Sequence, residues 1–296
     1  MKKLLAILAT LLMVVTMLGV LSGCGSEDND DKSGAKTSDN GKNDKKEDVE
    51  LSIEKTVLVD QDGIKVTATE VKEDKIFGKE INMLVENNTD KDVTVSCDDL
   101  IINNYMVTNL FVCSVSAGKK SNEGLDISST ELKEENIENI GLIEMTFNVY
   151  DSDSYDTIFK TDIVELKTSA YDNMDTLSEK DMGEELYNAD GIKIRAKMVK
   201  DDIFGDSVRL FVENKMGKDI MIDCDELAVN GFEVTSLMMS NLLDGKTLVY
   251  DLNLLKSDLE DNGIEKIEEV EMNFSFMEDN LFDTIGETGA LTLKVG

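Results

Sequence analysis

Two stretches of this chain are nearly the same: VENNTDKDVTVSCDDL at residues 85–100 and VENKMGKDIMIDCDEL at residues 212–227. Each carries a cysteine in the same slot, Cys97 in the first stretch and Cys224 in the second. A shift of 127 positions, from 85 to 212, relates them. A period this long indicates a duplicated domain, because the units of solenoid repeats run to only about 20–50 residues.

The same shift aligns much more of the chain than the two stretches. The further matches are Phe77-Gly78 with Phe204-Gly205, Val107-Thr108 with Val234-Thr235, Gly118-Lys119 with Gly245-Lys246, Met145 with Met272, and Asp156-Thr157-Ile158 with Asp283-Thr284-Ile285. We therefore expect two modules, at residues 49–168 and 184–296, joined by a polar linker at residues 169–183. Each module is expected to fold independently.

Both modules alternate apolar and polar residues with period two, which is typical of strands with one buried face. The apolar sets are Ile64/Val66/Ala68 with Ile192/Ile194/Ala196, Ile81/Met83/Val85 with Val208/Leu210/Val212, Val93/Val95/Cys97 with Ile220/Ile222/Cys224, and Met145/Phe147/Val149 with Met272/Phe274/Phe276. Several such strands in a short module predict an all-β fold of two tandem immunoglobulin-like β-sandwiches. A small closed barrel is the alternative, since alternation does not separate the two.

One short helical turn is expected in each module. Ser128 with Glu131 resembles a capping box, and its counterpart runs from Ser257 to a stop at Gly263.

The chain opens with MKKLLAILATLLMVVTMLGVLSGC, two lysines followed by an apolar run. This pattern predicts a signal peptide at residues 1–23. Leu21-Ser22-Gly23-Cys24 resembles the bacterial lipobox, which implies that Cys24 is lipidated and becomes the first residue. The alternative is an ordinary secretory leader with a chance cysteine. Residues 24–48 have almost no aliphatic content and are expected to be a disordered tether.

The composition argues against several classes of function. The formal net charge is −32, from 62 acidic and 30 basic residues, so nucleic acid and anionic headgroups are poor partners. The chain has no histidine, the usual residue of triads, metal sites and proton shuttles. Asp98-Asp99 and Asp225-Glu226 are neighbours on strands and point to opposite faces, so neither pair can flank one glycosidic bond. We expect no catalytic residues, cofactor or metal.

A further resemblance covers both modules. The stretches DGIKVTA, EINMLVENNTDKDVTV, INNYMV, AGKK and IEMTFNVYDSDSYDTIFKTD resemble the immunoglobulin-like repeats of lipoproteins of unknown function from Gram-positive anaerobic bacteria. The resemblance implies the fold and a position at the cell membrane, held by the lipid on Cys24, and it implies neither catalytic residues nor a cofactor. The second module departs from the pattern most at its tail, residues 277–289.

The cysteines have two interpretations. Cys97 and Cys224 are in register with core positions and are expected to pack as small apolar side chains. A disulfide between Cys97 and Cys113 is the alternative, because the compartment is expected to be oxidising. Ser240 stands in the matching slot of the second module, so the fold does not require that bridge.

The acidic stretch Asp151–Asp156 suggests calcium, but the EF-hand loop needs Gly and Glu where Asp156 and Asp162 stand. Local turn hydrogen bonding is the favoured interpretation.

Together these features predict a membrane-anchored extracytoplasmic lipoprotein with two non-catalytic modules that bind a protein or glycan of the envelope. A structural envelope spacer is the alternative, and a solute-binding or enzymatic surface lipoprotein is less favoured. A binder should carry an apolar surface patch, for which Leu84 and Phe211, outside the main core register, are the candidates.

Overall fold

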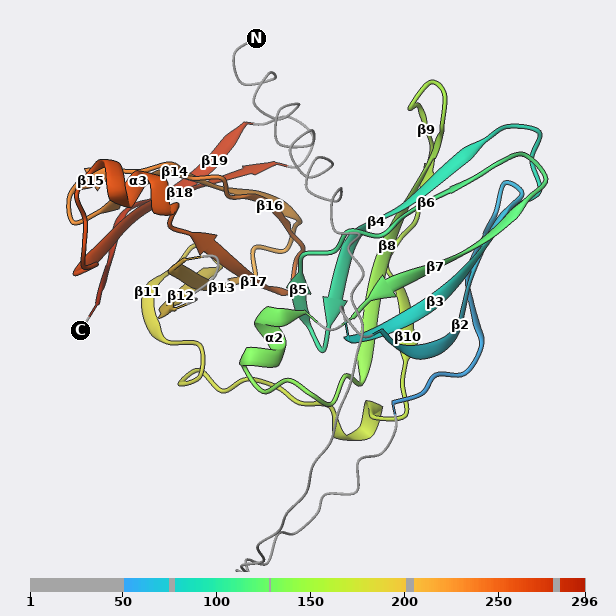
Figure 1. The fold of residues 1–296 in the computed structure, drawn as a ribbon, viewed down its shortest axis with the longest axis horizontal. Coiled ribbons are helices and arrows are strands. Elements are labelled where there is room, and N and C mark those ends of the chain that lie inside the picture. Colours follow the sequence, from blue (N-terminus) through green and yellow to red (C-terminus); the bar gives the residue numbers. More distant parts are fainter. Residues whose placement is uncertain (1–50, 75–77, 128, 201–204, 279–282, 296) are drawn as a thin grey trace, which may run out of the picture. The chain divides into compact units, whose positions relative to one another are not determined.

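The computed structural model of this chain describes residues 51–74, 78–127, 129–200, 205–278 and 283–295. Cys24, with the leader and tether expected around it, lies outside the described residues, as does Ser128. The described part is almost entirely β-structure (Figure 1), which confirms the all-β fold. No helix in these ranges is long and apolar enough to cross a membrane.

The first module is built from two sheets around one core. Its elements are β1 (Thr56–Gln61), β2 (Ile64–Asp74), β3 (Gly78–Asn87), β4 (Val93–Ile102), β5 (Tyr105–Val107), β6 (Val112–Val115), β7 (Lys120–Asp126), α2 (Thr130–Glu134), β8 (Leu142–Asp151), β9 (Thr157–Lys160) and β10 (Val164–Lys167). One sheet has the order β1-β2-β3-β7, and the other runs β10-β8-β4-β5 with β6 on β4 and β9 on β8. Apolar residues of β3 and β8, such as Met83 and Phe147, are fully buried in one cluster between these sheets. The architecture is thus a sandwich and not a small closed barrel.

The second module repeats this arrangement. Its elements are β11 (Glu184–Ala189), β12 (Ile192–Val199), β13 (Ser207–Asn214), β14 (Ile220–Val229), β15 (Phe232–Glu233), β16 (Met239–Leu242), β17 (Thr247–Asn253), α3 (Lys256–Asp261), β18 (Glu269–Glu278) and β19 (Thr284–Lys294). Its sheets are β11-β12-β13-β17 and β15-β14-β18-β19, with β16 on β14.

The duplication extends to the strand register. Cys97 opposes Phe147 across β4 and β8, and Cys224 opposes Phe274 across β14 and β18. A β-bulge follows each cysteine at the same place, before Asp99 in one module and before Glu226 in the other. Bulges re-aim the strand locally, so their repetition means that both modules bend these strands alike.

Buried asparagines explain why the repeated phrase includes VEN. The side-chain amide of Asn87 donates to the carbonyls of Lys91 (2.7 Å) and Val115 (2.9 Å). Asn214 makes the same pair of bonds, to Lys218 and Leu242, each at 2.9 Å. Each asparagine therefore satisfies two turn carbonyls that would otherwise be buried without a partner.

A second pair of asparagines closes the turns after β4 and β14. Asn103 and Asn230 both have positive φ, 51° and 52°, a conformation that asparagine tolerates better than most residues. The Asn103 side-chain oxygen accepts from the amides of Gly141 and Leu142. Asn230 accepts from two consecutive amides at the matching place, Glu268 and Glu269.

The helical turns exist, but their starts differ from the expected capping box. In α2 the cap is Ser129, whose hydroxyl accepts from the Leu132 amide at 3.4 Å, one residue later than Ser128. In α3 Ser257 lies inside the helix and Leu255 is the cap residue, with no side-chain cap bond. Gly263, with φ of 67°, follows the helix as expected for a stop.

Candidate functional site: the module junction and the groove

The two modules share one sheet. Strand β5 of the first module pairs in parallel with β17 of the second, Tyr105 opposite Thr247 and Met106 opposite Leu248. Figure 1 shows β5 beside β17, where the second sheet of one module continues into the first sheet of the other. Residues 49–296 form one compact unit. Independent folding of each module stays a prediction. Cutting the chain between the modules would break this strand pairing.

Apolar side chains cross the junction in both directions. Ile101 and Met106 pack in the core of the second module, while Phe211 and Val249 pack in the core of the first. The expected apolar patch at Leu84 and Phe211 is therefore wrong for Phe211, whose exposed fraction is 2%. Its ring lies on the outward face of β13, and the first module covers that face.

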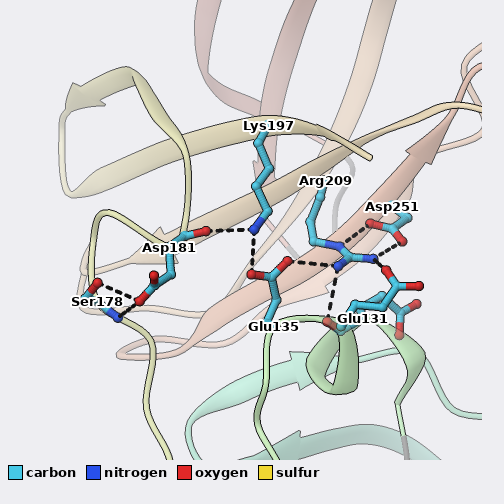
Figure 2. A network of polar contacts seen from close by, with 8 residues as sticks. Glu131, Glu135, Ser178, Asp181, Lys197, Arg209 and Asp251 are labelled. Atoms are coloured by element: carbon cyan, nitrogen blue, oxygen red, sulfur yellow. Dashed lines mark hydrogen bonds and ion pairs between the residues drawn. The ribbon is translucent and has the colours of Figure 1, made fainter. Parts of the chain in front are cut away.

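A buried arginine lies at the centre of the junction (Figure 2). Arg209, on β13, is 1% exposed. Its Nε and Nη2 donate to the two carboxylate oxygens of Asp251 on β17, both at 2.7 Å. From the first module, Glu134 accepts from Nη2 at 2.7 Å and Glu135 accepts from Nη1 at 2.9 Å. The guanidinium is therefore shared between a carboxylate of its own module and two carboxylates at the end of α2, Glu134 and the C-cap residue Glu135.

The charge of this arginine is stabilised by its partners. Burial by itself lowers the pKa of Arg209, but the hydrogen bonds that it donates to Asp251, Glu134 and Glu135 hold the pKa above its ordinary value. Lys197 adds a second cation on the other oxygen of Glu135, whose side chain is only 6% exposed. A further cross-module ion pair joins Lys246 to Glu144 at 2.6 Å, with both side chains largely buried.

The segment expected to be a linker, residues 169–183, is bound to both modules. Asp175 accepts from the amides of Glu138 (3.0 Å) and Asn139 (2.8 Å) in the first module. The Leu177 amide donates to the hydroxyl of Tyr105 at 2.7 Å. Near the end of the segment, the carbonyl of Asp181 accepts from Lys197 of the second module at 2.8 Å (Figure 2). Its polar composition therefore serves hydrogen bonding along a fixed path.

Among the residues that the structure describes, those of the junction do not recur at the equivalent positions of the repeat. By the shift of 127 positions, Arg209 and Asp251 correspond to Asn82 and Gly124, which oppose each other across β3 and β7. Met106 corresponds to Glu233, an exposed residue of β15. Each module therefore contributes a different half of the contact.

A groove with a volume of about 400 Å³ lies within the first module, between β7, the β5–β6 loop and the start of α2. Buried side chains of Leu100, Val107 and Phe111 form its floor. Leu110 lies on its rim and is 83% exposed, the largest exposed fraction among the exposed large apolar residues of the described ranges.

Acidic side chains line the same groove. Glu80 comes from β3, Glu123 from β7 and Glu131 from the first turn of α2. A Cβ at Gly124 would lie 2.3 Å from a carboxylate oxygen of Glu80. The missing side chain of Gly124 therefore leaves space in which the Glu80 carboxylate lies across β7.

The same two apolar positions are exposed in both modules. Leu110 and its counterpart Leu237 are 83% and 62% exposed. Two residues later, Val112 and its counterpart Met239 are 53% and 43% exposed. Single exposed apolar residues are common, but here the exposure recurs in register at the start of β6 and of β16.

The three cysteines in the described ranges, Cys97, Cys113 and Cys224, are free and buried. Burial raises the pKa of the thiol in each, to about 11 for Cys224. The Cys97 thiol donates to the carbonyl of Asp99 at 3.1 Å, inside the bulge. The structure thus has the core packing expected for Cys97 and Cys224 and does not contain the alternative disulfide.

The acidic stretch that suggested calcium is a turn. One oxygen of Asp151 accepts from the amides of Asp153 (3.0 Å) and Ser154 (3.1 Å), and the other pairs with Lys91 at 3.0 Å. These hydrogen bonds, that to the Ser154 amide first, lower the pKa of Asp151 to about 2. The pair recurs as Lys218 with Glu278 at 2.8 Å in the second module.

Sequence reasoning missed the junction and the groove. A signal for the junction was present in Leu210-Phe211-Val212 and Leu248-Val249-Tyr250, where apolar residues follow one another without alternation. Such runs are typical of strands covered on both faces. No comparable signal marked the groove, because Glu80 lies far in the sequence from the other acids that line it.

Neither the known family models nor the curated proteins contain a match to this chain. Among solved structures, the exo-β-D-glucosaminidase CsxA matches 76% of this chain at 13% identity, with a TM-score of 0.26. Amycolatopsis orientalis exo-chitosanase CsxA, in complex with PNP-β-D-glucosamine, matches 76% at 12% identity, with a TM-score of 0.27. This chain spans 26% of the length of the matched chain in each of these two structures. Likeness at this level carries no argument about activity.

The first prediction concerns the junction. Arg209→Met leaves the carboxylate of Asp251 without its cation and leaves Glu135 with Lys197 alone. Removing one partner of a buried ion pair costs ~3–5 kcal/mol of unfolding free energy. Urea unfolding of the full chain measures this loss. Lys266→Met is the control, because Lys266 has an exposed side chain and one long contact to Glu268. Equal stabilities of the two variants would contradict the role given to Arg209.

The second prediction concerns pH. The pKa of Cys224 is raised from an ordinary 9.0 to about 11 in the folded chain, so the unfolded chain loses this proton first as pH rises. The contribution to stability is complete below pH 9.0 and is lost as the pH approaches about 11. Unfolding free energies measured across this window should fall less steeply for Cys224→Ala than for the unchanged chain. Parallel slopes would show that this thiol does not titrate as described.

Proposed function

We propose that this chain is a lipid-anchored protein on the extracytoplasmic face of the cell membrane. Its two immunoglobulin-like modules bind another component of the envelope, a protein or a glycan, and catalyse nothing. The anchor is Cys24, at the end of the lipobox-like stretch Leu21-Ser22-Gly23-Cys24. Residues 24–48 then provide a hydrophilic tether between the lipid and the modules.

The observation that carries the binding function is the repeated exposure of apolar side chains. Leu110 and Leu237 occupy matching positions, as do Val112 and Met239, and all four are more than two-fifths exposed. Exposed apolar surface lowers solubility unless a partner covers it, so its presence in both copies supports a contact surface. Loops and strand edges on a rigid sandwich are common places for binding residues.

The chemistry of the core supports a function without catalysis. The chain has no histidine, and its described cysteines are buried with raised thiol pKa values, which makes them poor nucleophiles at neutral pH.

An envelope spacer is the second candidate, and the junction favours it. A shared sheet and the buried Arg209 fix one module against the other, as a rigid spacer requires. A spacer, however, gains nothing from exposed apolar side chains at matching positions.

The apolar positions separate these two functions. A variant with Leu110→Ser, Val112→Ser, Leu237→Ser and Met239→Ser should lose an envelope component that the unchanged full chain retains in a pull-down from envelope extract. The physical reason is the loss of apolar area from the contact, worth roughly 25 cal/mol per Å². Identification of the retained component by mass spectrometry is the readout.

The matched control carries Val57→Ser and Ile163→Ser. Both residues are exposed and apolar (49% and 43%), but neither has an exposed large apolar residue at the equivalent position of the second module. This control should retain the component. If the fourfold variant retains it equally well, binding does not use these positions and the spacer becomes the better description.

The anchor has its own test. Mass spectrometry of the mature protein should find the lipid on Cys24, with cleavage after Gly23. Cys24→Ala should release the chain to the medium or leave the leader attached, because no acceptor thiol remains at that position. Cys97→Ala, a change at a buried thiol, should leave lipidation intact. A mature chain that begins elsewhere would refute the anchor.

A further inference from the structure

We propose that the groove of the first module binds a basic side chain, arginine or lysine, presented by a peptide segment of the partner with apolar residues beside it. This inference rests on the proposed binding function and names the site and the chemistry of the partner.

The groove has the shape for such a side chain. Its volume of about 400 Å³ lies in the range of ordinary ligand sites, about 300–1,000 Å³. Its floor of Leu100, Val107 and Phe111 suits the methylene stem of arginine or lysine, which packs along apolar surface while the charged end meets polar groups. Leu110, exposed on the rim, is placed to contact an apolar neighbour of the basic residue.

The charge of the groove selects a cation. Glu80, Glu123 and Glu131 line it from three different elements, and none of its lining residues in the described ranges is a lysine or an arginine. Carboxylates lining a site that contains no basic side chain favour a ligand of positive charge. A guanidinium can also donate paired hydrogen bonds to carboxylates.

The duplication shows that the fold does not need Glu80 and Glu123, whereas Glu131 corresponds to another acid, Asp258. Glu80 and Glu123 correspond to Ser207 and Tyr250 in the second module, where the same strands form without them. Gly124, which leaves space for the Glu80 carboxylate, corresponds to Asp251. The first two differences add carboxylates beside β7, and the third leaves space for the carboxylate of Glu80.

The second module provides an internal precedent for the chemistry. Around the position that matches Gly124, the carboxylate of Asp251 holds the guanidinium of Arg209 with two hydrogen bonds of 2.7 Å. Residues of α2 complete that site. In the first module, Asn82 replaces the arginine, and the acids of the groove have no such internal guanidinium among their lining residues. The partner supplies it.

The test uses a fluorescein-labelled peptide, acetyl-Leu-Arg-Leu-Arg-Leu-amide, and the same peptide with citrulline in place of arginine. Citrulline keeps the shape and removes the charge. Fluorescence anisotropy with the full chain at low salt should show binding of the arginine peptide and roughly tenfold weaker binding of the citrulline peptide, as expected for the loss of two partly exposed ion pairs.

The protein variant is Glu80→Gln with Glu123→Gln, which should weaken binding of the arginine peptide roughly tenfold. Its control, Glu233→Gln with Glu265→Gln, removes the same charge from exposed positions of the second module and should change binding less than twofold. Leu110→Ser should weaken both peptides, because it removes apolar contact and leaves the charge. Thermal melts confirm that each variant is folded.

Three results would overturn the inference: no binding of the arginine peptide, equal binding of the citrulline peptide, or equal weakening by both pairs of Glu→Gln changes. The last would mean that the peptide responds only to the overall negative charge. Failure of the groove and failure of the proposed binding function can be told apart in the pull-down. If the envelope component is lost with the fourfold apolar variant but retained by Glu80→Gln/Glu123→Gln, the chain binds the component without using the groove.

Discussion

The buried guanidinium of Arg209 is the constraint on which the arrangement of the modules depends. A charge with only 1% exposure needs partners close by, and its carboxylates come from both modules. Moving the modules apart would leave Glu135 and Arg209 without one another, a state that is far more costly than losing an exposed ion pair. Around Arg209, the pairing of β5 with β17 adds backbone hydrogen bonds, and the apolar side chains that cross the junction add hydrophobic packing. The charge itself fixes the orientation, because the guanidinium geometry admits few alternatives.

Much of the fold could be predicted from the sequence, for clear physical reasons. Alternation of apolar residues set the buried faces, and the repeat set the correspondence between strands, so Phe147 and Phe274 were correctly expected in equivalent cores. The asparagines of the repeated phrase are different. Their repetition was visible, but the two carbonyls that each satisfies lie 4 and 28 residues away in the chain, and only the folded backbone brings them together.

The candidate site was harder to predict than the fold. Whether an outward residue such as Phe211 is exposed depends on whether another module covers it, and alternation within one strand does not contain that information. The groove shows the same limit, since Glu80 is distant in sequence from Glu123 and Glu131. That all three line one groove depends on the pairing of β3 with β7 and on the position of α2. Duplication compensates in part. Where the two modules differ at equivalent positions, as at Gly124 and Asp251, the fold does not require either residue, so the difference indicates a role specific to one module.

The unequal halves of the junction also determine how far the architecture can extend. In arrays of stacked repeats, every unit contacts the next one through the same pair of surfaces. Such an array can be extended by further units until a terminal unit has a different outer surface. Here the second module contributes Arg209 and Phe211 to the junction, while the corresponding face of the first module has Asn82 and Leu84. The first module contributes Met106, and the second module has Glu233 at the equivalent position. Neither outer face therefore carries the residues of this junction, so the same contact cannot be repeated at either end of the pair of modules.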